Sequence, residues 1–364
     1  MQNEGVAMSK KIIMNQQYED YWDLTMAWTD YTNEKFNNAL RIIVEFIDDK
    51  VDNSVGFTPE LYQNLQKKLT KEFQIDGASI RKGINQFFKL GFINNSGKSY
   101  HYLTKKFLEA KDDEEKRILY SRIMYENASF SRSKDNVATI NEIEFLIKTL
   151  ENCGEIDKED LLALMFTKIS EHTKGYLTKD EIEQKRRELK LNGAYERKYN
   201  QYGYLFGLCK VLTGIWVRGN KISHKPIVEL EQSEKSRSRD SYLQHLYKIE
   251  LIKEYKDIYK TNGGECVLEK LAYPVLIASH IKPYSKSEED ERFDSDNGLL
   301  LSKNMDSLFD LGYITFDDDG KIITSINLDE KVSSYVKKFR LDSEIYNTKR
   351  KKYMEYHRQN VFQG

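Results

Sequence analysis

The chain lacks the features that would place it in a membrane or in an oxidising compartment. Its longest uncharged apolar runs, such as residues 272–278, are far shorter than the roughly 18 residues that a membrane-spanning helix needs. The N-terminus has no charged-then-apolar secretory pattern, so we expect a cytoplasmic protein. Cys153, Cys209 and Cys266 are far apart and form no CxxC pair, which rules out a disulfide framework and argues against a structural zinc site.

The chain also lacks a large excess of positive or negative charge. The chain has 57 Lys and Arg against 58 Asp and Glu, a formal charge of −1. The average charge therefore excludes a strongly basic nucleic-acid binder, but it does not exclude a local basic surface. The 364 residues correspond to two or three domains at about 150 residues each. Only four prolines indicate few rigid linkers.

Hydrophobic spacing predicts an α+β protein that is predominantly helical and has four parts. We expect a helical lead-in over residues 1–33 and a winged-helix-like DNA-recognition domain over residues 34–135. Residues 136–260 are expected to form a domain that is either helical or a second winged-helix-like unit. A C-terminal domain follows over residues 261–364, after the breaker Asn262-Gly263-Gly264.

The region over residues 136–260 has its own predicted elements. Helices are expected near residues 140–152, 158–171, 178–190 and 198–212, with Asp157 as the cap of the second. Two short strands are expected around Arg218-Gly219-Asn220. The polar residues 231–240 are predicted to be a linker or surface loop.

Three helices followed by a hairpin, the order of a winged-helix module, are predicted between residues 34 and 103. Thr58 is the expected cap of the second helix, and the third helix, residues 77–90, has an apolar stripe on one face. A hairpin turned at Ser96-Gly97 is expected over residues 92–103. The opposite face of the third helix and the hairpin carry side chains that bind phosphates and base edges: Ser79, Arg81, Lys82, Asn85, Gln86 and Lys98. The alternative is a solvated face of a protein-contact module.

The C-terminal part begins with a strand–loop–strand–helix pattern. Residues 275–281 are predicted to be a short buried strand, and residues 298–301 a second one. Ser302 is the expected cap of the helix that follows. A hairpin turned at Asp319-Gly320 comes after that helix.

Three polar residues of this pattern suggest chemistry. His280 lies near the end of the first strand, and Asn304 and Asp306 lie in the first turn of the helix. An imidazole opposite amide and carboxylate oxygens suits metal-assisted phosphodiester hydrolysis, because the imidazole can deprotonate a water and the oxygens can hold a hard cation. Mg²⁺ or Mn²⁺ suits such ligands better than zinc.

The string ASHIKP…DNGLLLSKNMDSLFD…GYITFDDDGKI, over residues 265–325, resembles the HNH endonuclease family with its ββα-metal active site. It is especially similar to the branch found in restriction-type and defence nucleases. The resemblance implies that His280 is the general base, that Asn297 bridges the loop and orients the imidazole, and that Asn304 is a metal ligand. It also implies a divalent metal, most simply Mg²⁺, and double-stranded DNA as the substrate.

The sequence departs from the family pattern at one ligand position. Many members carry Asp immediately before the catalytic His, where this chain has Ser279. Asp306 is the candidate replacement, with Asp310 behind it or bracing the helix. Arg292, in the loop between the strands, is expected to reach a phosphate or to pair with a nearby acid. His357 is expected to brace the C-terminal helix rather than to contact the DNA backbone.

Three functions remain open at this point. The first is a restriction-type endonuclease, which would need a homodimer or two successive nicks for a double-strand break and would belong with a cognate methyltransferase. The second is a nuclease that depends on modified DNA or defends against phage with little site preference. The third is a winged-helix DNA-binding protein whose HNH-like domain is inactive, which only Ser279 supports.

Overall fold

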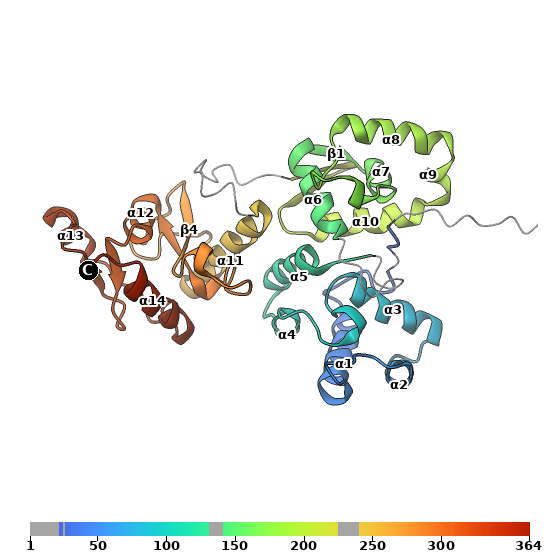
Figure 1. Ribbon diagram of the computed structural model, residues 1–364, viewed down its shortest axis with the longest axis horizontal. Coiled ribbons are helices and arrows are strands. Elements are labelled where there is room, and N and C mark those ends of the chain that lie inside the picture. Colours follow the sequence, from blue (N-terminus) through green and yellow to red (C-terminus); the bar gives the residue numbers. More distant parts are fainter. Residues whose placement is uncertain (1–21, 25, 131–140, 225–239) are drawn as a thin grey trace, which may run out of the picture.

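The computed structural model describes residues 22–24, 26–130, 141–224 and 240–364, apart from the side chains of Arg197 and Tyr199. Figure 1 shows two helical modules at one end of the molecule and a mixed domain at the other, with α11 (Ser241–Tyr259) between them. The linker predicted over residues 231–240 lies outside the described residues, apart from Asp240.

The first module contains the predicted three helices. They are α1 (Glu34–Lys50), α2 (Pro59–Phe73) and α3 (Gly77–Lys89), followed by α4 (Thr104–Leu108) and α5 (Asp113–Asn127). Thr58 caps α2 as expected, because its side chain accepts from the backbone N–H of Leu61. The predicted hairpin is smaller than expected: a single antiparallel bridge joins Ile93 and Tyr100 around the 3₁₀ turn Asn95–Gly97.

The predicted helical lead-in is not found in the described part of residues 1–33. Residues 22–24 and 26–33 contain no helix. Trp22 is 6% exposed, and its indole N–H donates to the carbonyl of Thr167 at 3.2 Å. The segment therefore lies against the second module, where burial of a large aromatic ring outweighs local helix propensity.

The second module combines helices with a small antiparallel sheet of order β1-β3-β2. Its elements in chain order are α6 (Glu142–Cys153), β1 (Glu155–Asp157), α7 (Asp160–Met165), the 3₁₀ turn Ile169–Glu171, α8 (Lys179–Leu191), α9 (Ala194–Arg197), α10 (Tyr199–Val211), β2 (Ile215–Arg218) and β3 (Lys221–His224). The helix predicted over residues 158–171 is shorter than expected. Asp157 does not cap it, because this residue is extended in β1 and pairs with Lys221.

The third part contains the predicted strand–loop–strand–helix unit. Its elements are β4 (Leu276–His280), the 3₁₀ turns Tyr284–Lys286 and Ser295–Asn297, β5 (Gly298–Ser302), α12 (Lys303–Asp310), β6 (Ile314–Phe316), β7 (Ile322–Thr324), α13 (Glu330–Val336) and α14 (Thr348–Asn360). The side chain of Ser302 caps α12 by accepting from the N–H of Met305. The turn at Asp319-Gly320 also forms as predicted, with Gly320 at φ +79°.

Two hydrophobic cores meet within α11. Tyr242 and Leu246, in its first half, belong to the core shared by the two helical modules. Tyr247, Leu251 and Tyr255 belong to the core of the third part. The helix is therefore a structural component of both, and it brings Tyr247 next to the β4–β5 hairpin. No helix in the described ranges is long and apolar enough to cross a bilayer.

Candidate active site

His280 ends β4, opposite Gly298 at the start of β5. Its side chain is held by rings on both sides and the residue is only 8% exposed. The ring of Tyr247, from α11, is stacked on the imidazole at 4.8 Å between centroids. The ring of Tyr284 meets it edge-on at 5.7 Å. The imidazole is therefore confined to one orientation.

A backbone carbonyl selects the tautomer of this imidazole. Nε2 of His280 lies 2.7 Å from the carbonyl oxygen of Arg292. A carbonyl oxygen can only accept, so Nε2 must carry the proton and donate it. In the neutral ring Nδ1 then carries the lone pair, which is the form a general base needs.

Asn297 is the internal bridge of the β4–β5 loop. It is fully buried, and its side-chain oxygen accepts from the N–H of Lys282 at 2.7 Å. Its amide nitrogen donates to the carbonyls of Lys282 and Glu291 and to the hydroxyl of Ser287, at 3.1–3.2 Å. These bonds join both ends of the loop that carries the Arg292 carbonyl. Asn297 thus acts on the imidazole through the loop rather than by contact with a substrate.

The C-terminal helix α14 supports the same loop from outside. Arg350 is fully buried, donates to the carbonyl of Ser295 at 2.7 Å and pairs with Glu254 of α11 at 2.9 Å. Lys349 pairs with Asp294 at 2.6 Å. These two cations of α14 are therefore paired within the protein.

His357 braces α14 against the domain. It is 1% exposed, its Nδ1 lies 3.0 Å from the hydroxyl of Thr315, and its Nε2 lies 3.1 Å from the carbonyl of Phe309. Its ring is stacked on Phe309 at 3.9 Å. Burial lowers the pKa of His357 to about 4, so the ring is neutral at pH 7.

The predicted metal ligands lie on and beside α12, which packs against β4 and β5. Asn304 and Asp310 are exposed and Asp306 is half-buried. The hydroxyl of Ser279 is buried and makes no hydrogen bond to any described residue. It is therefore an oxygen donor without a hydrogen-bond partner, at the position where the sequence resemblance implies Asp.

The donor atoms of these residues are oxygens, the type of ligand that hard divalent cations take. Within the described ranges, no three His, Cys, Asp or Glu side chains are grouped closely enough to enclose an ion. Mg²⁺ is commonly bound by one or two protein oxygens, with waters and substrate phosphates completing its shell. Asn304, Asp306 and Ser279 suit that mode, and zinc with its closed N/S shell is a poorer match.

One of the residues predicted to contact DNA from α3 is buried instead. Gln86 is 1% exposed, because its side chain accepts from the N–H groups of Ala27 and Trp28 and donates to the carbonyl of Trp28. It belongs to the core contact of the lead-in segment and is not available to a base. The spacing rule missed this because the partners lie almost sixty residues earlier in the chain.

The other predicted DNA-contacting residues remain at or near the surface. Arg81, Lys82 and Lys98 are exposed. Asn85 is half-buried and accepts from the hydroxyl of Tyr62, and Ser79 donates to its capping partner Asp76.

Arg292 has a role that its sequence position did not indicate. Its backbone carbonyl orients His280. Its guanidinium lies over the ring of Tyr284 at 5.4 Å and donates to the carbonyl of Ser287 at 3.3 Å. Tyr247 and Arg350 were also missed as supports of the site, because no local pattern connects them with residues 276–302.

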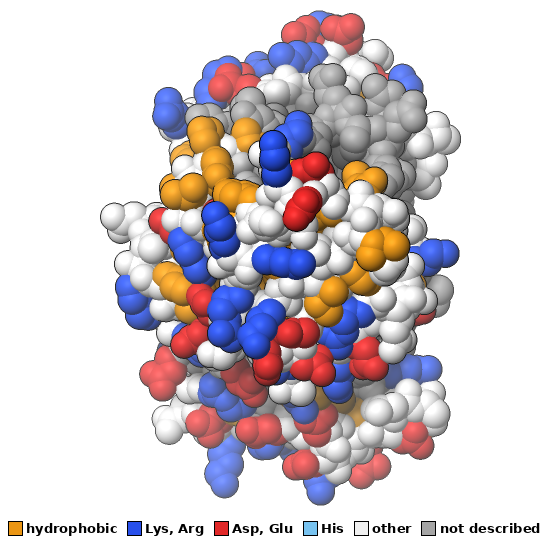
Figure 2. Space-filling view, turned by 90° about the vertical axis from the view of Figure 1, so that its left-hand side faces the viewer, with side chains coloured by type: hydrophobic (Ala, Val, Ile, Leu, Met, Phe, Trp, Pro, Cys, Tyr) orange, Lys and Arg blue, Asp and Glu red, His pale blue; other side chains and the backbone are white. Residues whose placement is uncertain are grey.

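The surface around the domain limits how DNA can approach. Figure 2 shows the face at the end of the molecule formed by the third part, where basic and acidic side chains are interspersed. A cavity of about 710 Å³ between the first module and the β4–β5 loop is lined by five acids: Glu126, Glu144, Asp240, Glu289 and Asp290. The five acids outnumber the one arginine of this lining, Arg292, so the cavity disfavours phosphates.

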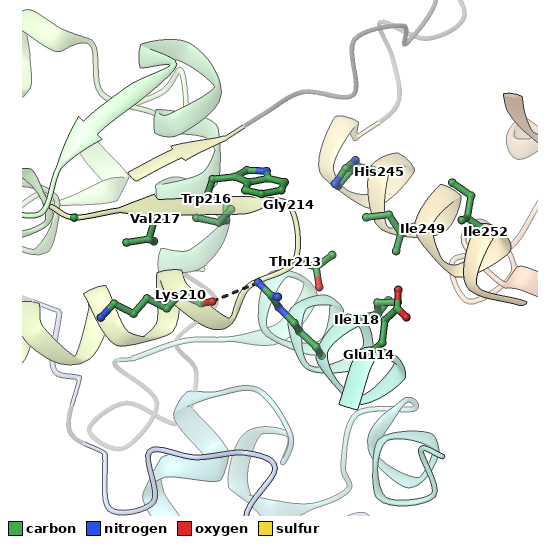
Figure 3. Close-up of a pocket in the computed structure, with 13 residues that line it drawn as sticks. Glu114, Ile118, Lys210, Thr213, Gly214, Trp216, Val217, His245, Ile249 and Ile252 are labelled. Carbon is green, nitrogen blue, oxygen red and sulfur yellow. Dashed lines mark hydrogen bonds between the residues drawn. The ribbon is translucent and has the colours of Figure 1, made fainter. Parts of the chain in front are cut away.

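A larger cavity, of about 1000 Å³, lies away from His280. Figure 3 shows it between α5, the α10–β2 segment and α11, with Trp216 and His245 facing it from different elements. It does not belong to the hydrolytic site.

The structure thus places the strand–loop–strand–helix unit β4–β5–α12 around His280, in the order that the sequence resemblance implies. Comparison with known families agrees: residues 266–317 match the family described as HNH endonuclease. A search of curated proteins found no match. The chain therefore carries an HNH endonuclease domain over β4, β5 and α12, which points to a nuclease acting on DNA.

Proposed function

We propose that this protein is a restriction-type DNA endonuclease that hydrolyses phosphodiester bonds of double-stranded DNA with the help of a divalent metal, most simply Mg²⁺. The observation that carries the proposal is the hydrogen bond between Nε2 of His280 and the carbonyl of Arg292. It commits the imidazole to the tautomer that can accept a proton at Nδ1. An endonuclease of this type works on DNA inside the cell, so the proposal places it in the cytoplasm.

In this mechanism His280 takes a proton from the attacking water at Nδ1, while Nε2–H stays on the Arg292 carbonyl. Asn297 and the stacked ring of Tyr247 keep the imidazole from turning. Asn304 and Asp306, with Ser279 as a third donor, would hold the metal, which when bound neutralises charge on the scissile phosphate. One such site cuts one strand, so a double-strand break requires a homodimer or two successive nicks.

Sequence recognition is assigned to the helical modules. Arg81 and Lys82 of α3, with Asn85, Ser79 and Lys98, form the proposed DNA-contacting surface. The first module orders three helices before a bridge and turn, and the second orders a helix, a strand, helices and two strands. We assign both modules to winged-helix-like units from these orders, with the hairpin of the first reduced to one bridge. A cognate methyltransferase would protect the host sites of such an enzyme.

Plasmid cleavage with Mg²⁺ tests the proposal, using methylated and unmethylated DNA and the His280→Ala variant as the control. Discrete fragments from unmethylated DNA alone are expected, and loss of the base should reduce the rate by about 10²–10⁴-fold. Cleavage of methylated DNA only would indicate a modification-dependent enzyme, and a smear would indicate a non-specific defence nuclease. A variant that cuts as fast as the parent would remove His280 from the mechanism.

The inactive-domain alternative has two observations in its favour. Within the described residues no group of three His, Cys, Asp or Glu side chains could hold an ion, and this chain has Ser279 where the resemblance implies a carboxylate. DNA binding without cleavage in Mg²⁺ or Mn²⁺ would establish that alternative.

A further inference from the structure

The loop that orients His280 is held by a side chain from the first module. Nη1 of Arg122, on α5, donates to the carbonyl of Phe293 at 2.6 Å. That peptide follows directly on the Arg292 carbonyl that accepts from His280. A shift of the Phe293 peptide would therefore move the atom that selects the imidazole tautomer.

The ring of Phe293 strengthens this dependence. It packs against Tyr247 at 6.3 Å and against Tyr284 at 5.6 Å, which are the two rings that enclose His280. The guanidinium of Arg122 also lies 5.9 Å from the Phe293 ring. The backbone and the ring of Phe293 thus connect Arg122 with the two restraints on the imidazole, which are the Arg292 carbonyl and the enclosing tyrosine rings.

Arg122 itself has little freedom. It is 3% exposed, and its Nε donates to Glu126 at 3.0 Å. Its Nη1 also lies 3.4 Å from Glu250, and its Nη2 donates to the hydroxyl of Tyr102 at 2.9 Å. Burial opposes its ionisation, but the Glu250 and Glu126 carboxylates outweigh this effect and hold the pKa of Arg122 above its ordinary value. A planar guanidinium with donors fixed in several directions is a rigid support, which a lysine could not reproduce.

The same network reaches the turn that carries Lys98. His101 and Tyr102 follow the Ile93–Tyr100 bridge, and both contact Glu126: Nε2 of His101 lies 3.1 Å from one carboxylate oxygen, and the Tyr102 hydroxyl donates at 3.1 Å. A continuous series of bonded groups therefore runs from the proposed DNA-contacting turn to the loop of the nuclease site.

We propose that Arg122 is a positioning residue of the nuclease site, supplied by the first module, which holds the Phe293 peptide and through it the orientation of His280. The inference rests on the proposed function, since it assigns a role in the same reaction. It makes the first module part of the catalytic support as well as a DNA-contacting unit.

The chain offers a matched control at Lys253. This residue is 6% exposed on α11 and pairs with Asp112, the cap of α5, at 2.7 Å. It is thus a second buried cation between α5 and α11, but the carboxylates to which it donates, Asp112 and Asp257, lie outside the β4–β5 loop. Arg122→Met and Lys253→Met each remove one such cation, and only the first removes a bond to the loop.

The experiment compares full-length Arg122→Met, Arg122→Lys, Lys253→Met and the parent. Single-turnover nicking gives the maximal rate, titration gives DNA affinity, and melting curves report folding. Long-range ¹H–¹⁵N spectra of histidine-labelled protein give the tautomer of His280, assigned with His280→Asn. The spectra do not depend on cleavage, so they test whether Arg122 positions His280 even if the parent protein does not cut DNA. Failure of the parent to cut would refute the proposed function and not the positioning role.

We expect Arg122→Met to lose about tenfold to a hundredfold in maximal rate. Its DNA affinity should change by less than about threefold, and its His280 signal should leave the Nε2–H tautomer. Arg122→Lys should fall between it and the parent. Lys253→Met should melt earlier but keep its rate within about threefold. Equal rate losses in Arg122→Met and Lys253→Met, or an unchanged His280 signal in Arg122→Met, would overturn the proposal.

A milder variant covers the case in which Arg122→Met does not fold. Tyr102 is 50% exposed, so Tyr102→Phe is tolerated by the fold while it removes the hydroxyl that accepts from Arg122. A rate loss of about twofold to fivefold with unchanged DNA affinity would support the proposal. A parental rate together with a parental His280 signal would refute it.

Discussion

The nuclease domain and the first module differ in how their proposed functional side chains are held: buried and fixed in the first case, exposed in the second. His280 is 8% exposed, a carbonyl and two aromatic rings fix its imidazole, and the buried amide of Asn297 holds the loop that carries the carbonyl. Arg81 and Lys82 of α3 extend into solvent. A group that must present one tautomer at one place requires a rigid, desolvated support, whereas a group that binds phosphate can gain its order from the bound nucleic acid.

This difference predicts where a substitution should act. A change in the support of His280 should lower the maximal rate and the stability of the fold. A change on the exposed face of α3 should lower DNA affinity and leave both unaffected. Four predictions test this division, from the largest expected effect to the smallest.

Asn297→Ala should have the largest effect. It removes hydrogen bonds at both ends of the loop and leaves the buried N–H of Lys282 without its acceptor. We expect about a hundredfold loss of cleavage rate and a decrease of about 2–4 kcal/mol in the free energy of unfolding. Asn304→Ala, at an exposed position, is the control that should leave stability unchanged. If Asn297→Ala nicked DNA at the parental rate, the catalytic rate would not depend on the rigid support of His280.

His357 should make the nuclease domain sensitive to acid. Its pKa is lowered to about 4 in the folded protein, from about 6.5 in the unfolded chain. The unfolded chain therefore binds the proton first, so stability is full above pH 6.5 and is lost as the pH falls towards 4, by about 3 kcal/mol in all. Urea unfolding at pH 7.0, 5.5 and 4.5 measures this slope. His357→Gln should be less stable at pH 7 with a shallower slope, and an equal slope would exclude His357 as the cause.

Gln86→Ala and Arg81→Ala should separate folding from DNA binding within α3 itself. The first should cost about 1–3 kcal/mol of stability, because the backbone groups of Ala27 and Trp28 lose their partners, and should leave DNA affinity unchanged. The second should cost about 1–3 kcal/mol of binding energy with stability within about 0.5 kcal/mol of the parent. Melting curves and DNA titrations distinguish them. Reversed effects would show that α3 does not present this face to DNA.

Ser279→Asp should add the carboxylate that many related nucleases carry. Without metal, a carboxylate at this buried position should lower the melting temperature by a few degrees, because its charged form is poorly solvated. Mg²⁺ or Mn²⁺ should restore the melting temperature of this variant and leave that of Ser279→Ala unchanged. A variant that does not respond to either ion would place the metal elsewhere.

Local patterns predicted most of the local structure. Thr58 and Ser302 cap α2 and α12 as expected, because capping depends on a side chain within three residues of the N–H it accepts from. The β4–β5–α12 order is equally local. The hairpin predicted over residues 92–103 is reduced to one bridge, and the lead-in is not helical where it is described, because packing against distant residues determines the conformation of both.

The sequence by itself determined the capped helices, the hairpin with His280 at its end, and the motif that matches the HNH family, since all of these depend on neighbours along the chain. Only the tertiary structure decided that Gln86 is buried, that the Arg292 carbonyl selects the His280 tautomer, and that Arg122 and Arg350 hold the loop. The physical reason is the separation of the partners along the chain. These contacts join residues up to 171 positions apart, and no periodicity of the sequence indicates which distant carbonyl accepts from a buried donor.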